Sequence, residues 1–250
     1  IWIPLSNAIF GSDKTSSWAI FGLNSTEVLG ILGALWIIFV TFIATKGVER
    51  ITKITSIGGT FVAILNVVLI IGAILVVILN SGEFAEPINN IINTFTISPN
   101  PDYKSIIQIL SFITFAIFAF GGLEVLGGLV DQTKDAERTF PKAIIIAATI
   151  ISIGYAIGIF ACGMFTNWNN ILSGDNVNLS NVAYILMNNL GVQIGYAIGL
   201  SESASIQMGL WVARFVGISM LLALTGAFFT LTYSPLKTLL SGAPKEVWPG

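Results

Sequence analysis

The sequence contains no histidine, a single cysteine and few charged residues. Without histidine the chain cannot build a His-ligated haem, a His-containing zinc site or an imidazole proton relay. Cys162 alone cannot form an internal disulfide or a cysteine-cluster metal site, and its apolar neighbours favour a small buried side chain over a reactive thiol. No GxxxxGK[ST] phosphate-binding loop occurs, so nothing points to an ATPase. We therefore expect no enzyme activity, no cofactor and no bound metal.

The scarcity of charge also defines the class of protein. Only 10% of the residues are charged and 54% are hydrophobic, whereas a soluble domain carries about 25% charged residues. Several apolar runs approach or exceed the roughly 20 residues that span the hydrocarbon of a bilayer. The composition indicates a multi-pass, all-α membrane protein forming a single transmembrane domain over residues 1–250. The first residue is Ile1 rather than Met, which favours a fragment of a longer protein.

Five apolar stretches are long enough to cross the membrane. They lie at about 27–45, 54–80, 105–130, 143–165 and 208–233. A sixth stretch at about 181–200 is moderately apolar, but it carries Asn188, Asn189 and Gln193. Its status therefore depends on the positions of the positive charges.

Lysine and arginine gather on one side of the membrane if the chain crosses five times. Two then lie outside, Lys14 and Lys104, and Arg214 lies within the last span. The other eight share the opposite side: Lys46, Arg50, Lys53, Lys134, Arg138, Lys142, Lys237 and Lys245. The positive-inside rule assigns that side to the cytoplasm. Because a sixth crossing would weaken this bias, we predict that 181–200 forms an external helix.

An acidic residue and two glycine pairs lie inside the third span. Glu124 follows Gly121 and Gly122 and precedes Gly127 and Gly128. A carboxylate at membrane depth costs about 2.5–3.5 kcal/mol, so such a residue is a candidate for function. We expect the helix to break near 119–122 and to line a cavity, because freed backbone groups are tolerated only beside protein or water. Close helix packing by the glycines, and a structural hydrogen bond from Glu124, are the alternatives.

Other polar residues have simpler expected roles. We expect Arg214 to reach toward the outer interface with Glu202 as a partner, a place on the substrate path being the alternative. Asn66 is expected to form a hydrogen bond between helices. In the cytoplasmic stretch 131–143, Asp131 is expected to pair with nearby Lys134, Arg138 or Lys142, and Pro141 to begin the fourth span.

The run FAFGGLEVLGGLVDQTKDAERTFPKA, at 118–143, resembles the sixth transmembrane helix and following loop of the amino acid–polyamine–organocation permeases. That family has an aromatic and glycine-rich segment before a Glu, and a loop of the form Asn-Pro-x-Arg-x-x-Pro-Arg/Lys-Ala. This chain has Asp135 and Ala136 where Asn-Pro is common, and otherwise keeps the loop pattern through Ala143. The likeness is closest to the glutamate:γ-aminobutyrate antiporter branch and the YjeM-like permeases. A second likeness, from Ser234 to Pro249, is to the cytoplasmic loop after the eighth helix of that family.

The resemblance implies a fold and a binding site. The fold is the LeuT-like inverted repeat, and this chain would cover about helices 4–8 of twelve. The family binds substrate on the backbone of two broken helices, of which only the second lies here. The residues implied for substrate binding are Phe118 as a gating aromatic, Glu124 as the coupling or proton-sensing acid, and the backbone of Ala119, Phe120, Gly121 and Gly122.

Together these observations predict a secondary active transporter of amino acids or related amines in the cytoplasmic membrane. Antiport and proton coupling are both open. The expected partners are the amino acid or amine substrate and the lipid bilayer, with protons as a candidate coupling ion, a homodimer as an open possibility and no nucleic acid. An ion channel is one alternative, although no selectivity-filter signature is visible. A non-transporting subunit of a membrane complex is another.

Overall fold

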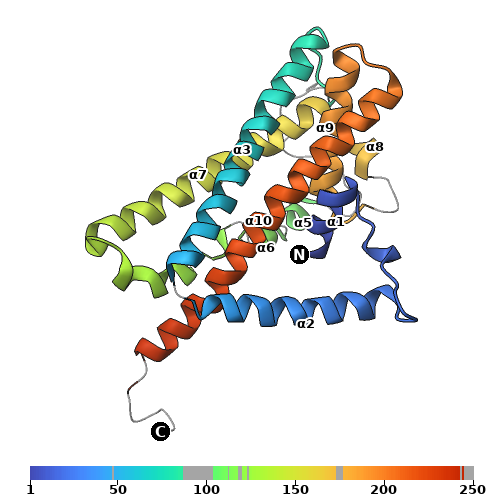
Figure 1. Ribbon diagram of the computed structural model, residues 1–250. Helices are drawn as coiled ribbons and strands as arrows, with labels where there is room; N and C mark the ends of the chain where they lie inside the picture. The colour runs from blue at the N-terminus through green and yellow to red at the C-terminus, as the bar shows by residue number, and fades with distance from the viewer. Residues whose placement is uncertain are drawn as a thin grey trace.

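In a computed structural model, the described residues are 1–46, 48–86, 104–111, 113–117, 120–122, 124–172, 177–242 and 244. This part of the chain is helical throughout, apart from turns and one isolated bridge between Ile20 and Leu23. Figure 1 shows long helices that cross one another, with shorter helices between and beside them. The predicted residues Phe118 and Ala119 lie outside the described residues.

Among the described residues, four helices are long and apolar enough to cross a membrane. They are α2 (Ser25–Ala44), α3 (Val48–Leu79), α7 (Ala136–Phe165) and α10 (Glu202–Gly242). The shorter elements are α1 (Trp2–Phe10), η1 (Thr15–Ser17), α5 (Ile106–Ser111), α6 (Ile113–Ile117), η3 (Glu124–Gln132), α8 (Trp168–Leu172) and α9 (Val182–Ala197). The four long helices fall on four of the five predicted spans. The remaining one, 105–130, contains α5, α6 and η3 instead of one continuous helix.

Local sequence explains where several helices begin and end. Asn24 and Glu27 form a capping box, in which each side chain accepts a hydrogen bond from the other residue's backbone N–H, and this fixes the start of α2. Gly11 ends α1 with φ 72°, a left-handed conformation that glycine adopts without strain.

Two prolines lie inside helices rather than at their ends. The prediction that Pro141 begins a helix was wrong, because α7 already starts at Ala136. Pro235 lies inside α10, which continues to Gly242 past the predicted end of the last span at residue 233. Pro235 has no backbone N–H, so it cannot donate to the carbonyl of Leu231 four residues earlier.

The centre of the molecule is α10, which packs against α3, α9 and α1 and lies beside α3 in Figure 1. Glycines allow these close crossings. A Cβ on Gly58 of α3 would lie 2.7 Å from the Leu222 carbonyl oxygen of α10, and one on Gly217 would collide with the backbone of Ala8 in α1. Small residues at helix contacts are the usual means of bringing membrane helices together.

The external helix predicted at 181–200 corresponds to α9. Its buried side chains Tyr184, Met187, Leu190 and Ile194 join a core cluster with residues of α3, α7 and α10. Polar residues also contribute to this packing. The side-chain amide of Asn189 donates to the carbonyl of Phe165 (3.1 Å), the last residue of α7, and to the hydroxyl of Thr166 (3.2 Å). These bonds tie α9 to the end of α7, where helix carbonyls lack partners within the helix.

Large apolar side chains cover the outer faces of the long helices. Examples are Ile38 (66% exposed) on α2, Ile78 (67%) on α3 and Ile150 (65%) on α7. In water such a surface would be an extensive apolar patch. In a bilayer it needs no polar cover, because lipid tails are as apolar as the side chains.

Candidate functional site

The interruption between α6 and η3 is the centre of the candidate site. The helix α6 ends at Ile117, Gly121 and Gly122 lie in a turn, and η3 begins at Glu124. Gly122 has φ 99°, which L-residues with a side chain rarely adopt. Phe120 is 37% exposed, and a Cβ on Gly122 would meet no atom within 4 Å. The backbone thus turns here in open space rather than inside tight packing.

Glu124 is the first residue of η3, and its side chain lies outside the described part of the structure. For Glu124 the structure therefore gives the position of the backbone along the chain but not the direction of the carboxylate. Gly121 and Gly122 form the turn, Phe120 comes directly before it, and Glu124 is the first residue of the following helix. The assignment of these residues, with Phe118 and Ala119, to substrate binding stays a prediction.

The element η3 is a 3₁₀ helix of nine residues, whereas 3₁₀ runs longer than three or four residues are uncommon. It packs against α10 and α7. Its tightest approach is at Gly128, where a Cβ would collide with the hydroxyl of Ser234 and would lie 2.6 Å from the Ser234 carbonyl oxygen. Ser234 is fully buried, so this contact brings the two helices almost backbone to backbone.

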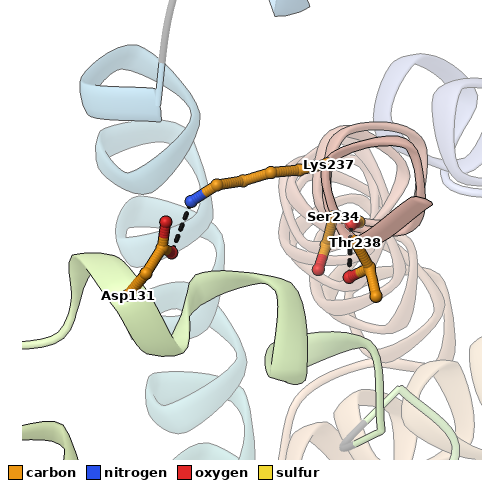
Figure 2. A network of polar contacts seen from close by, with 4 residues as sticks. All are labelled: Asp131, Ser234, Lys237 and Thr238. Carbon is orange, nitrogen blue, oxygen red and sulfur yellow. Dashed lines mark hydrogen bonds and ion pairs between the residues drawn. The ribbon is translucent and has the colours of Figure 1, made fainter. Parts of the chain in front are cut away.

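One turn further along, Asp131 forms an ion pair with Lys237 of α10, and the distance from Oδ1 to Nζ is 2.5 Å. Figure 2 shows this pair beside Ser234 and Thr238, whose hydroxyl donates to the Ser234 carbonyl at 3.0 Å. The expectation that Asp131 pairs with Lys134, Arg138 or Lys142 was wrong. Its partner lies 106 residues away in the sequence, a separation that local spacing cannot reveal.

A cavity of about 170 Å³ lies between α3, η3 and α10. It is half open to the surface and mostly apolar, although five of its seven lining residues carry a hydroxyl group; they are Ile51, Thr52, Thr55, Ser56, Leu126, Thr230 and Tyr233. The hydroxyls of Thr55 and Thr230 both donate to the carbonyl of Gly226, at 3.3 and 3.1 Å. Their oxygen lone pairs are left to accept hydrogen bonds from water or from a cationic group. Sequence reasoning missed this cavity, because its residues come from three elements.

Two further predicted contacts were wrong. Arg214 does not pair with Glu202: its Nε donates to the carbonyl of Ile9 at 3.3 Å, and its guanidinium lies 4.7 Å from the centre of the Trp211 ring. The positive charge therefore lies at the C-terminal end of α1, where a helix dipole favours it. The side chain of Asn66 donates to Val62 of the same helix at 2.9 Å, not to another helix.

No group of three or more Cys, Asp or Glu side chains that could hold a metal ion occurs within the described residues.

Comparison with known proteins identifies the family. The model of the amino acid permease family matches residues 1–249. Over 249 residues the chain is 50% identical to the inner membrane transporter YjeM of Escherichia coli. The match covers 100% of this chain and 49% of YjeM. It is 26% identical over 231 residues to the aspartate/glutamate permease AcaP of Lactococcus lactis subsp. cremoris, covering 91% of this chain and 42% of that protein. No solved structure gives a significant match.

The chain spans about half the length of the curated relatives it matches. The family match and the four apolar helices confirm the predicted fold class, an all-α membrane protein of LeuT-like architecture, of which this chain is a part. They also confirm a multi-pass protein of the cytoplasmic membrane, in agreement with the inner-membrane location in the name of YjeM. The resemblance drawn from residues 118–143 is confirmed as well, and the chain belongs to the amino acid permease family.

Proposed function

We propose that the full-length protein is a secondary active transporter that moves amino acids or related amines across the cytoplasmic membrane, by exchange or with proton coupling, and is not an enzyme. The observation that carries this proposal is the interrupted helix between Ile117 and Glu124, in a chain of the amino acid permease family. Transporters commonly bind substrates at such interruptions.

The interruption suits a zwitterionic substrate for a physical reason. Where a helix ends, backbone carbonyls lack partners, and where the next begins, backbone N–H groups lack partners. The carbonyls can accept hydrogen bonds from an ammonium group, and the N–H groups can donate to a carboxylate. In this proposal the backbone at 119–122 contacts the ammonium and carboxylate groups of the substrate, Phe118 gates the site and Glu124 senses or carries the proton.

Acidic amino acids are the first substrates to test, because AcaP is named an aspartate/glutamate permease. The substrate panel should also contain a neutral amino acid, a basic amino acid and γ-aminobutyrate, whose ammonium and carboxylate groups are not attached to the same carbon. A preference for α-amino acids would support recognition of both charged groups at the break.

The deciding experiment uses full-length protein reconstituted in proteoliposomes loaded with unlabelled amino acid. Saturable uptake of labelled amino acid, accelerated by internal substrate or by a pH gradient, is the expected result. Voltage-driven currents without exchange would favour an ion channel instead. A folded protein that moves none of the panel would favour a non-transporting subunit of a membrane complex.

A further inference from the structure

Arg214 is a charged residue of the apolar helix α10, and two contacts fix its position. Its Nε donates to the carbonyl of Ile9, at the end of α1, at 3.3 Å. Its guanidinium also lies 4.7 Å from the centre of the Trp211 ring, one turn earlier on α10. The first contact comes from another helix and the second from its own. A guanidinium plane that is both hydrogen-bonded and stacked is pre-organised to bind a further partner.

The positive charge of Arg214 has no counter-charge in the described part of the chain. Within the described residues, the one ion pair joins Asp131 to Lys237, and Arg214 makes no side-chain hydrogen bond besides that to Ile9. The terminal amino groups of its guanidinium therefore have no partner among these residues. Because an unpaired charge is costly in a membrane-spanning helix, such residues are paired or reach a polar region.

The side chain of Arg214 leans toward the outer side of the membrane. Side chains of a helix tilt toward its N-terminus, and the contact with Trp211, three residues earlier, follows this direction. The N-terminus of α10, at Glu202, is its outer end, because the positive-inside rule assigns Lys237 near the other end to the cytoplasm. Arg214 also lies close to the predicted start of the last span at residue 208. Its guanidinium therefore approaches the depth of the outer lipid headgroups.

The exposed surface around Arg214 changes from polar to apolar along α10. Gln207, Trp211, Arg214 and Ile218 share one face of the helix, because they are three or four residues apart. Gln207 is exposed nearest the outer end, Trp211 is 66% exposed and Ile218, one turn deeper than Arg214, is 42% exposed. Ile9 of α1, also exposed, lies beside this face through its contact with Arg214. Tryptophan is typical of the membrane interface, so this order matches a lipid headgroup above its acyl chains.

We propose that Arg214, Trp211 and Gln207 bind the headgroup of an anionic phospholipid in the outer leaflet of the cytoplasmic membrane. The terminal amino groups of Arg214 donate to two oxygens of the lipid phosphate, a geometry that the guanidinium fork matches. Ile218 contacts an acyl chain below. The bound lipid supplies the negative charge that Arg214 lacks. In a zwitterionic lipid the cationic headgroup offsets the charge of the phosphate, so the attraction is weaker. This lipid site lies apart from the helix break and does not depend on the proposed transport.

The test measures the lipid dependence of stability in the purified full-length protein. Anionic phosphatidylglycerol is added to the protein in detergent and compared with zwitterionic phosphatidylcholine of the same acyl chains. Phosphatidylglycerol should raise the melting temperature of the parent further than phosphatidylcholine does, because a ligand that binds the folded state stabilises it. This additional rise should disappear in Arg214→Gln. Native mass spectrometry should show that the variant binds phosphatidylglycerol about tenfold more weakly or worse, as expected for loss of a charged hydrogen-bond partner.

Three further variants make the result specific. Lys104→Gln removes an exposed positive charge from the same predicted side of the membrane and should keep the additional rise. Arg214→Lys keeps the charge but loses the planar fork, so only part of the rise should remain. Trp211→Leu removes the ring on which the guanidinium stacks and should also reduce the rise. If Arg214→Gln does not fold, Arg214→Lys and Trp211→Leu decide, because both retain a positive charge at residue 214.

Several results would overturn the lipid site. One is an additional rise that is as large in Arg214→Gln as in the parent, or undiminished in both Arg214→Lys and Trp211→Leu. Another is an Arg214→Gln variant whose melting temperature falls equally in the two lipids, because the counter-charge would then belong to the rest of the full-length protein. Loss of the additional rise in Lys104→Gln would indicate a general attraction between the lipid and positive charge, and would also overturn the site.

Discussion

The hydroxyl of Thr55 on α3 donates a hydrogen bond of 3.3 Å to the carbonyl oxygen of Gly226 on α10, 171 residues further along the chain. The bond is possible because Gly226 has no side chain: a Cβ there would lie 2.8 Å from the Cα of Thr55. This pair, with Gly58 against Leu222, fixes how closely the two helices on either side of the cavity approach each other.

Replacing Gly226 with alanine should therefore destabilise the protein. The new Cβ would meet backbone rather than a movable side chain, and overpacking of this kind costs about 1–3 kcal/mol. The expected result is a lower melting temperature of the full-length protein in detergent. Gly33→Ala on α2, where a Cβ meets nothing within 4 Å, is the matched control. Equal melting temperatures for the two variants would contradict the close crossing.

Asn189→Ala should weaken the attachment of α9 to α7. It leaves the Phe165 carbonyl and the Thr166 hydroxyl without the amide that now bonds them, and loss of a buried hydrogen-bond partner costs about 1–3 kcal/mol. Gln193→Ala removes only the 3.3 Å bond from Gln193 to Asn189 and should cost less. Limited proteolysis and thermal unfolding of the two variants measure these losses of stability. A larger loss of stability in Gln193→Ala than in Asn189→Ala would contradict the role of Asn189 in holding α9 to α7.

Glu124→Gln should impair transport with little loss of folded protein. If Glu124 is the proton-sensing acid, the amide cannot change charge, so the pH dependence of uptake should flatten. The uptake rate should fall about tenfold or more, within the range of ordinary coupling free energies. Uptake into proteoliposomes across a pH series measures this. Glu137→Gln, an exposed acid in the first turn of α7, is the control. Parental pH dependence in Glu124→Gln would remove this residue from the mechanism.

Alkaline pH should destabilise the packing of α9 through Tyr184. Burial, with a smaller contribution from the negative charge of Asp13, raises the pKa of Tyr184 from 10 to about 12. Because the folded protein holds the phenol proton more tightly than the unfolded chain does, this stability is complete below pH 10 and is lost as the pH rises toward 12. Tyr184→Phe cannot ionise there.

The melting temperature should thus fall less between pH 9 and about 11 in Tyr184→Phe than in the parent. Tyr196→Phe, which alters a half-exposed tyrosine at the end of the same helix (46% exposed), is the control. Parallel pH curves for the parent and Tyr184→Phe would contradict a buried, protonated phenol.

The sequence was sufficient for the features that depend on local pattern. Apolar runs predicted the four long helices, because a membrane span must be apolar over its whole length. The resemblance at residues 118–143 predicted the family.

The features that sequence reasoning missed depend on residues far apart in the chain. Asp131 was assigned to nearby lysines and arginines, but it reaches Lys237 on another helix. Arg214 was assigned to Glu202, but α1 offers the carbonyl of Ile9 205 residues away. A charge pattern shows which partners are near in sequence, whereas the crossing of helices decides which are near in space.

Pro235 has a mechanical consequence for α10. At 1.5 Å per residue, its 41 residues would extend about 60 Å, roughly twice the thickness of the hydrocarbon layer. Between Gly209 and Gly226, α10 packs closely against α1, α3 and α9. Pro235 removes one backbone hydrogen bond of the helix just beyond this closely packed portion. Lys237 therefore lies in the end of α10 that follows the missing backbone hydrogen bond, and this end is joined to the rest of the helix by one such bond fewer.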